Sequence, residues 1–355
     1  MSKAKKILII SGNDDSHTQA VVWGLRQLGH NPTIFDRSKF PSEISAAWSQ
    51  NRPPVVSLTD PHGEIHVSPF DVIWCRRLSP LPTPRESSHP DDWEIINRES
   101  TIFLDSIIPY LSHKDTFWVN PYFSSRIAER KIPQLVAADR IGFKVPDTLI
   151  GNDHDSILEF FNKHRGKIIY KPHSPGGWGN DDGSSIIIGT SKVLEEHLSD
   201  RESILACPGI YQELIEKKCE YRVTVMGNQV FAGIIDSQAD GESIDWRFDS
   251  AIGRPPYIVT TLPEEISNLC ISYCKEMNLQ FACIDLIHGT NDEIVFLEAN
   301  QAGQFLWIEE CDAQTSMLDK FCRFLSGSDS AHEAESTPIN FADFRDSMEA
   351  PGATV

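Results

Sequence analysis

The sequence predicts a mixed α/β protein with more than one domain, and three observations support this fold class. The chain opens with a strand, a helix and a second strand, which is the start of a doubly wound α/β domain. A strand over Ile168–Lys171 leads into a glycine-rich loop, and residues 281–310 contain two apolar strands joined by a turn. With 355 residues, the chain is long enough for two or three substantial cores.

The first domain begins with alternating strand and helix patterns. Lys6–Ile10 is an apolar run typical of a buried parallel strand, and His17–Leu28 has helical spacing that stops before Gly29. A second strand is expected near Pro32–Phe35, and a long helix over Asp91–Leu111. The loop after the first strand lacks G-x-G-x-x-G, which argues against a dinucleotide-binding dehydrogenase.

Two adjacent arginines, Arg76 and Arg77, follow a short strand at Asp71–Trp74. In α/β sheets, ligands bind beyond the carboxyl ends of the strands. The pair is therefore a candidate substrate site, although a solvated pair of loop residues explains it equally well.

Lys171 ends its strand directly before Pro172–Gly179, a loop that contains three glycines. A lysine beside the backbone N–H groups of such a loop is typical of phosphate recognition. The loop is not a Walker A sequence, because no G-K-[ST] ends it. A plain turn remains the alternative.

The stretch Phe281–Glu310 carries the clearest chemical signal. One strand contains Asp285 and the next contains Glu298, while Asn300 lies two residues on and therefore on the same face. A tight hairpin brings Asp285 opposite the Glu298 end, so that hard oxygen ligands converge as Mg²⁺ requires. Carboxylates in apolar strands are costly unless paired or metal-bound, which favours a metal site over acids that merely reach solvent.

Further strands and helices are expected around this hairpin. Ile210–Ile215 is a short strand, and the alternation in Glu220–Met226 places Glu220, Arg222 and Thr224 on one face, with Gln229–Ile235 as the partner strand. Helices are expected over Ile266–Met277 and, as the last helix, Leu318–Leu325. From Ser326 the composition is acidic and poor in apolar residues, which predicts a disordered tail.

Composition excludes several classes of function. Net charge is −19, which argues against nucleic acid as the main partner. The eight cysteines form no C-x-x-C and no spacing typical of zinc, so buried thiols in a reducing, cytoplasmic setting are expected. The apolar run near the start is too short for a signal peptide, and no run is long enough to span a membrane.

Taken in chain order, these features resemble the ATP-grasp superfamily. Lys131, the Lys171 loop, the strand at Gln212–Ile215, Glu220 with Arg222, and the Asp285–Asn300 hairpin follow one another as they do there. The resemblance implies a pre-ATP-grasp α/β domain at 1–119, followed by ATP-grasp subdomains at 120–210 and 211–325 and the tail at 326–355. It also implies ATP and Mg²⁺ as cofactors.

The resemblance also implies a role for each matching position. The nucleotide contacts implied are Lys131, Lys171, Ser174, Gly176, Gly177, Gln212, Glu213, Leu214, Ile215 and Glu220. Among these, the lysines contact phosphates, the Ser174–Gly179 loop closes over them, Gln212–Ile215 forms the hinge against adenine, and Glu220 holds the ribose. Asp285, Glu298 and Asn300 hold Mg²⁺, while Arg222 and Arg247 stabilise charge on an acyl phosphate.

A narrower likeness is to the microviridin-type peptide maturases, the graspetide synthetases. It is carried by Trp74–Arg77, Asp245–Arg247 and Gly303–Glu309. The family pattern E-x-N-P-x-G-Q-W is replaced here by E-A-N-Q-A-G-Q-F, with Gln301 and Phe305 as the departures. The likeness implies an acidic precursor peptide with a leader segment as substrate, held in part by Arg76 and Arg77, and a homodimer.

This likeness implies an ATP-dependent ligase that closes ester or amide rings between side chains of the peptide. A RimK-type ligase, which adds a free amino acid to a peptide or protein carboxylate, is an alternative. Another alternative is a regulatory protein that binds ATP without catalysing a reaction. The presence of Lys131, Lys171, Arg222 and the three metal ligands argues against it.

Overall fold

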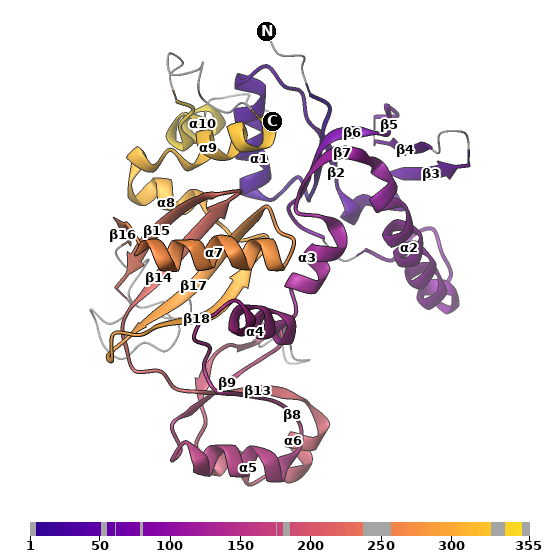
Figure 1. Ribbon diagram of the computed structural model, residues 1–355. Helices are drawn as coiled ribbons and strands as arrows, with labels where there is room; N and C mark the ends of the chain where they lie inside the picture. Colours follow the sequence, from indigo (N-terminus) through magenta and orange to yellow (C-terminus); the bar gives the residue numbers. More distant parts are fainter. Residues whose placement is uncertain are drawn as a thin grey trace.

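The computed structural model describes residues 5–50, 55–60, 62–78, 81–174, 176–179, 185–236, 257–327 and 338–349. Figure 1 shows a parallel sheet at one end, an antiparallel sheet in the middle and a small sheet with two helices at the other end. The chain therefore has the mixed α/β organisation that the sequence predicts.

The parallel sheet comes from the first third of the chain. Its order is β2 (Thr33–Phe35), β1 (Ile7–Ile10), β6 (Phe70–Cys75) and β7 (Ser112–Val119). All residues of β1 are buried, as expected for a strand covered on both faces. Helix α1 (Ser16–Gln27) begins after Asp15, whose carboxylate accepts a hydrogen bond from the Thr18 N–H at 2.9 Å. The predicted strand–helix–strand start is confirmed.

The rest of this region forms a peripheral layer. An antiparallel ribbon consists of β3 (Ser45–Ser49), β4 (Val55–Thr59) and β5 (Ile65–Val67). Helix α2 (Trp93–Ile107) is shorter than the predicted helix over Asp91–Leu111, because 3₁₀ turns flank it at Pro90–Asp92 and Ile108–Leu111. Pro109 lies in the second turn and has no N–H to continue an α-helix.

The small sheet has the order β12 (Ser191–Lys192), β9 (Ile168–Lys171), β13 (Gly209–Glu213) and β8 (Thr148–Gly151). Helices α5 (His154–Lys163) and α6 (Arg201–Ala206) lie against it, with a core that includes Ile157, Ile168 and Tyr211.

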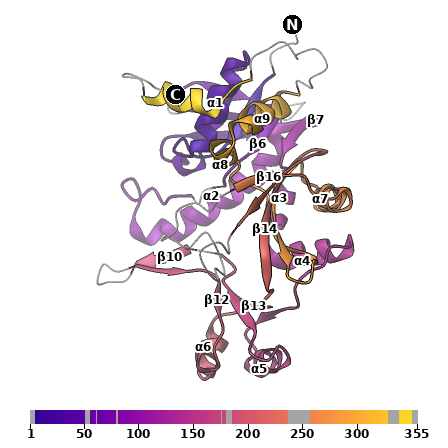
Figure 2. The same ribbon diagram turned by 90° about the vertical axis from the view of Figure 1, so that its left-hand side faces the viewer.

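The glycine-rich segment differs in part from the predicted loop. Gly176–Gly179 is strand β10, which pairs antiparallel with β11 (Ser185–Ile188). Figure 2 shows β10 extending to one side of the small sheet. Glycines lack a Cβ and tolerate many backbone conformations, so their number alone does not distinguish a loop from a strand.

The antiparallel sheet has the order β16 (Tyr257–Thr260), β15 (Gln229–Ile235), β14 (Lys217–Met226), β17 (Phe281–Gly289) and β18 (Ile294–Asn300). Helices α4 (Lys131–Arg140) and α7 (Glu264–Glu276) pack on one face, over a core that includes Val223, Ile284 and Phe296. Helix α3 (Tyr122–Ala128) precedes α4. The predicted hairpin and its neighbouring strands are confirmed.

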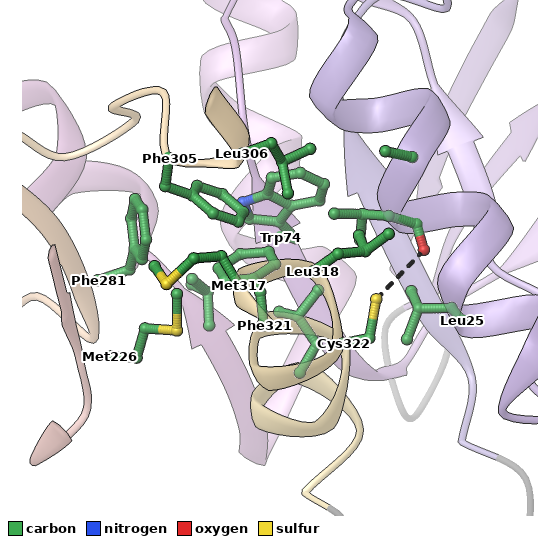
Figure 3. Packing of buried hydrophobic residues seen from close by; sticks show 14 of the residues in the cluster. Leu25, Trp74, Met226, Phe281, Phe305, Leu306, Met317, Leu318, Phe321 and Cys322 are labelled. Carbon is green, nitrogen blue, oxygen red and sulfur yellow. Dashed lines mark hydrogen bonds between the residues drawn. The ribbon is translucent and has the colours of Figure 1, made fainter. Parts of the chain in front are cut away.

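One hydrophobic core joins the parallel and antiparallel sheets. Figure 3 shows one cluster in which Leu25 of α1 lies next to Cys322 of α9 (Met317–Ser326), and Phe281 of β17 lies next to Phe305 on the other side. Trp74 of β6 and Phe321 of α9 belong to the same cluster. Phe305 lies 4.7 Å from Phe321 and 5.4 Å from Phe281 between ring centroids. Because one core is shared, the two sheets hold each other in place.

The predicted tail is wrong for residues 338–349. Helix α10 (Phe341–Glu349) follows α9, and Phe344 is 5% exposed, with its ring 6.0 Å from that of Trp23 in α1. The Glu309 carboxylate of α8 (Leu306–Cys311) accepts hydrogen bonds from the N–H groups of Leu318 at 2.8 Å and Phe341 at 2.7 Å. Average composition hides this helix, because a few spaced apolar side chains suffice to dock it.

Two expectations from composition can be compared with the structure. The eight cysteines all lie within the described residues and none of them forms a disulfide, and Cys283 is buried as expected. Among the described residues, no helix is long and apolar enough to cross a membrane.

We predict that Phe344→Ala lowers the free energy of unfolding by about 3 kcal/mol, because it removes a buried ring from the contact between α10 and α1. Chemical denaturation measures the change. Met348→Ala, on the same helix but 37% exposed, serves as the matched control. Equal stability of the two variants would contradict docking of α10.

Candidate functional site

The centre of the site is a row of charged side chains across neighbouring strands. In the antiparallel register, Arg222 of β14 pairs with Asp285 of β17, which pairs with Glu298 of β18. Directly paired residues point to the same face of a sheet. The prediction that the hairpin places Asp285 opposite Glu298 is confirmed.

Each of the two carboxylates lies next to a cation of the same chain. Arg222 Nη1 donates to Asp285 Oδ1 at 2.7 Å, and Lys131 Nζ of α4 donates to Glu298 Oε2 at 2.6 Å. The Asp285 and Glu298 side chains are 15% and 20% exposed, so the row is shielded but still accessible. Lys131, predicted from resemblance as a phosphate contact, thus lies beside a predicted metal ligand.

Arg222 stays charged in this environment. Burial by itself lowers the pKa of its guanidinium, but the adjacent Asp285 carboxylate outweighs burial and raises the pKa above its usual value. Its Nη2 donates to the Gln304 carbonyl at 3.2 Å. Within the described part of the chain, its buried Nε has no hydrogen-bond partner. The side chain is therefore a fixed positive charge on the site's face.

The donor set suits Mg²⁺. Asp285, Glu298 and Asn300 supply only oxygen ligands, and two of them are carboxylates. Asn300 ends β18 and is exposed, and its Oδ1 accepts a hydrogen bond from the Ala302 N–H at 3.0 Å. This hydrogen bond orients the side-chain amide of Asn300. The three residues fit the metal that the sequence predicts.

Lys171 lies on the small sheet beside Gln212. Lys171 Nζ donates to Gln212 Oε1 at 2.8 Å, and Gln212 Nε2 donates to Thr148 Oγ1 at 3.0 Å. Gln212 is 3% exposed, so its amide is held rigidly. Of the other predicted nucleotide contacts nearby, Ser174 is exposed, and Gly176 and Gly177 lie in β10.

The segment predicted as the adenine hinge leaves the small sheet. Glu213 is the last residue of β13, and its Oε1 accepts from the Asp147 N–H at 2.9 Å. The Leu214 N–H donates to the Lys167 carbonyl at 3.0 Å, and Ile215 follows. This segment connects the small sheet to β14, the position that a hinge between subdomains requires.

Glu220 has a partner that the sequence did not indicate. Lys217 Nζ donates to its Oε1 at 2.6 Å, and both side chains are more than nine-tenths buried. The alternation along the strand predicts that Glu220 shares a face with Arg222. Nothing in the sequence marks Lys217, three residues earlier, as its partner.

The adjacent arginines predicted as a substrate site have different surroundings. Arg76 is 1% exposed and donates through Nη1 to the Ala302 carbonyl, whereas the Arg77 side chain is 52% exposed and lies 2.9 Å from Asp15 Oδ2. Both guanidinium groups lie against the Asp15 carboxylate, Arg76 Nε at 3.3 Å from Oδ1 and Arg77 Nε at 2.9 Å from Oδ2, so the two arginines differ in exposure but share a partner. Arg77 is accessible to a peptide and Arg76 is not. Arg247 lies outside the described residues.

Two buried amides hold the hairpin and were not identified as functional from the sequence. Asn120 Nδ2 donates to the carbonyls of Phe281 and Gln301, and its Oδ1 accepts from the N–H groups of Gln280 and Phe281. Gln134 of α4 donates to the Ala299 carbonyl at 2.9 Å and accepts from the Ala299 N–H at 3.1 Å. Ala299 lies between Glu298 and Asn300. For Asn120 the signal available in the sequence was a polar residue after an apolar strand, which is too common to be decisive, and Gln134 lies within α4 and gave no such signal.

His17 of α1 accepts hydrogen bonds from two backbone groups beyond the hairpin. Its Nε2 accepts from the N–H groups of Phe305 at 3.0 Å and Leu306 at 3.2 Å, so the imidazole must be neutral. Burial, and then the nearby Arg76 cation, lower its pKa to about 3, although Asp15 opposes this shift. A histidine on a helix face gives no such indication in the sequence.

Family models match two consecutive parts of the chain. The MvdD pre-ATP grasp domain matches residues 6–126, and the RimK-like ATP-grasp domain matches residues 132–320, which is more than half of the chain. The chain belongs to the RimK-like ATP-grasp family. The expected fold, an ATP-grasp fold after a pre-ATP-grasp domain, is thereby confirmed, as is the assignment as an ATP-dependent ligase.

Solved structures with this fold include ligases that modify ribosomally made peptides. A RiPP-associated ATP-grasp ligase from Chryseobacterium gregarium, in complex with ADP and a leader and core peptide, is similar at 26% identity and a TM-score of 0.82, over 92% of this chain and 98% of that one. Macrocyclase MdnB from Microcystis aeruginosa MRC is similar at 25% identity and a TM-score of 0.74, over 90% and 99%.

A third structure supports the fold alone. Macrocyclase MdnC from Microcystis aeruginosa MRC, bound with precursor peptide MdnA, is similar at 23% identity and a TM-score of 0.79, over 91% of this chain and 99% of that one. Among curated proteins, no sequence matches this chain.

The two departures from the E-x-N-P-x-G-Q-W pattern fit the structure of this ATP-grasp protein. Phe305 stands in place of tryptophan and is fully buried among Phe281, Phe321 and His17. A phenylalanine needs no hydrogen-bond partner there, whereas an indole N–H would. Gln301 stands in place of proline, and its Nε2 donates to Glu129 Oε1 at 3.2 Å.

We predict that His17 makes stability depend on pH. Its pKa is about 3 in the folded protein, whereas an unperturbed histidine has a pKa of 6.5, so between these limits the unfolded chain binds more protons. Stability that is complete above pH 6.5 is therefore lost as the pH falls, by up to about 1.4 kcal/mol per pH unit. His17→Gln keeps an acceptor but does not titrate, so its unfolding free energy declines less.

Denaturant unfolding at several pH values measures this difference. His62→Gln, at an exposed histidine, is the control and keeps the wild-type dependence. Parallel curves for wild type and His17→Gln would refute the assignment.

Proposed function

We propose that the chain activates Asp or Glu side chains of a ribosomal precursor peptide as acyl phosphates and closes ester or amide macrocycles with Ser, Thr or Lys side chains. ADP and phosphate are released. The observation that carries the proposal is the row Arg222, Asp285 and Glu298 with Lys131, in a chain whose first domain matches the MvdD pre-ATP grasp model.

The neighbouring structures support a peptide as the partner. The Chryseobacterium gregarium ligase holds a leader and core peptide together with ADP, and MdnC holds a precursor peptide. This chain covers 98% of the former, so the parts of that ligase have counterparts here. Arg77, exposed beside Asp15, supplies a local basic contact for an acidic peptide on a chain whose net charge is −19.

The chemistry requires activation, because a carboxylate repels nucleophiles and has no leaving group. Its oxygen attacks the γ-phosphorus of ATP, the bond to ADP breaks, and an acyl phosphate forms. A hydroxyl or amine then attacks the acyl carbon and loses its proton, and the C–O bond to phosphate breaks. The peptide loses one water per ring.

The chain's residues divide this work. Lys131 and Lys171 neutralise phosphate charge, Glu213–Ile215 supplies backbone groups to adenine, and Glu220 holds the ribose. Asp285, Glu298 and Asn300 would hold Mg²⁺, which would supply further positive charge to neutralise the phosphates when bound. Lys131 Nζ lies 2.6 Å from Glu298 Oε2, which supports the proposal that Lys131 contacts the phosphates beside a metal held by Glu298.

Arg222 stabilises the negative oxygen that develops when the nucleophile attacks. Its charge is fixed by Asp285 and by the Gln304 carbonyl, so little reorganisation is needed during the reaction. Arg247 is proposed for the same charge from sequence resemblance alone.

We predict that Asp285→Asn lowers turnover at least about a hundredfold, because several kcal/mol of charge stabilisation are lost. ATP binding falls less, since adenine and ribose contacts remain. ADP release and nucleotide binding are measured separately. Asp292→Asn, an exposed acid in the turn of the same hairpin, is the control and keeps wild-type turnover. A fully active Asp285→Asn variant would contradict the metal assignment.

The reaction itself is tested by intact mass. The protein is incubated with ATP, Mg²⁺, free amino acids and any short acidic peptide that is encoded beside its gene, and we predict loss of whole water masses together with ADP release. Fragmentation then locates the rings. Added amino-acid mass would instead indicate the RimK-type ligase, and bound ATP without ADP release or mass change would contradict catalysis on this peptide.

A further inference from the structure

The backbone that follows the last metal ligand is held from several directions. Side chains of separate elements hydrogen-bond to residues 301–306: Asn120 to the Gln301 carbonyl, Arg76 to the Ala302 carbonyl, Arg222 to the Gln304 carbonyl, and His17 to the N–H groups of Phe305 and Leu306. Asn300 lies directly before this segment, which we call the 301–306 segment.

Two side chains of the pre-ATP-grasp domain, His17 and Arg76, make three of these hydrogen bonds. His17 lies on α1 and Arg76 follows β6, more than two hundred residues before the segment in sequence. Both side chains are buried, at 6% and 1% exposure. Neither side chain is among the predicted nucleotide or metal contacts. Each nevertheless hydrogen-bonds to the backbone that follows Asn300, a predicted metal ligand.

Asp15 holds Arg76 in its orientation. The Asp15 Oδ1 atom lies 3.3 Å from Arg76 Nε and accepts from the Thr18 N–H at 2.9 Å. The ion pair with Asp15 fixes the orientation of the buried guanidinium, so that its Nη1 points to the Ala302 carbonyl. In the described part of the chain, Arg76 Nη2 has no partner, so these contacts define the side chain's position.

The segment also packs tightly against the charged row. A Cβ built on Gly303 would lie 2.4 Å from Cys283 Cβ and 3.1 Å from Arg222 Nη2. If the segment shifted, Gly303 would press against Arg222, and Asn300, which is joined to the start of the segment, would move with it. Its position and the geometry of the site are coupled.

We propose that His17 and Arg76 are positioning residues, through which the pre-ATP-grasp domain sets the place of Asn300 and Arg222. The proposal rests on the nucleotide and metal site of the proposed function, but not on the peptide reaction. His17 acts as the backbone acceptor at the start of α8, where the cap residue Phe305 provides no side-chain hydrogen bond. The first domain thus contributes to the metal site without touching the metal.

The experiment compares His17→Leu, which removes the acceptor, with His17→Gln, which restores one. Titration calorimetry measures the affinity for ADP with and without Mg²⁺. The affinity with Mg²⁺ divided by the affinity without it reports how well the metal site is formed. We expect His17→Leu to lower this ratio about tenfold, the scale of contacts that orient metal ligands, and His17→Gln to keep it near wild type. Binding of ADP without Mg²⁺ stays unchanged in both.

Hydrogen exchange of the peptide covering residues 300–311 is measured in parallel. The amides of Phe305 and Leu306 lose protection in His17→Leu and retain it in His17→Gln. Arg76→Lys, which keeps the charge but not the fork of donors, provides a second test if His17→Leu does not fold, with the same lowered ratio. Arg140→Met, at an exposed ion pair with Glu276, is the control that keeps the wild-type ratio.

An unchanged ratio in His17→Leu, with the segment exchanging faster, would overturn the proposal, because the segment would then move without affecting the metal. A wild-type protein with no Mg²⁺ enhancement of ADP binding would overturn it as well, together with the metal assignment. If instead the ratio responds as expected but the peptide never loses water, the positioning role stands and only the macrocycle reaction fails.

Discussion

The register between β14, β17 and β18 is the constraint on which the site depends. Because side chains alternate along strands, a slip of one residue would turn Arg222, Asp285 or Glu298 into the core occupied by Val223, Ile284 and Ala299. Burying those charges in that apolar core would be prohibitive. The apolar face under α4 and α7 therefore fixes the register that aligns the charged face.

Charge compensation lets that row remain half-buried. Asp285 keeps the Arg222 guanidinium ionised, and Lys131 balances Glu298 from a helix on another part of the chain. The row thus holds two cations and two carboxylates, so its charges balance within a protein whose net charge is −19. Because each charge is already paired, a ligand that binds here exchanges its own ionic contacts for those within the protein.

The first domain and the ATP-grasp region are coupled through one core. Trp74, Phe305 and Phe321 share it (Figure 3). Helix α10 packs against α1 at its edge, through Phe344 and Trp23. Polar side chains at its edge, chiefly Asn120, His17 and Arg76, end on backbone groups near the metal ligands. Rigid support of this kind is what places reactive groups within the tolerance that catalysis requires.

The sequence by itself predicted the Asp285–Asn300 hairpin, the strands beside it, the strand–helix–strand start and the helices α1, α2, α7 and α9, because apolar periodicity and acids within apolar strands are local signals. Local spacing also predicted that Asp285 faces Glu298. Only the tertiary structure decided that Arg76 is buried while Arg77 is exposed, that Lys217 pairs with Glu220, and that α10 docks where composition predicted disorder. It alone revealed His17 and Asn120 as supports of the site. Their partners lie more than a hundred residues away, and such contacts arise from packing that no local pattern records.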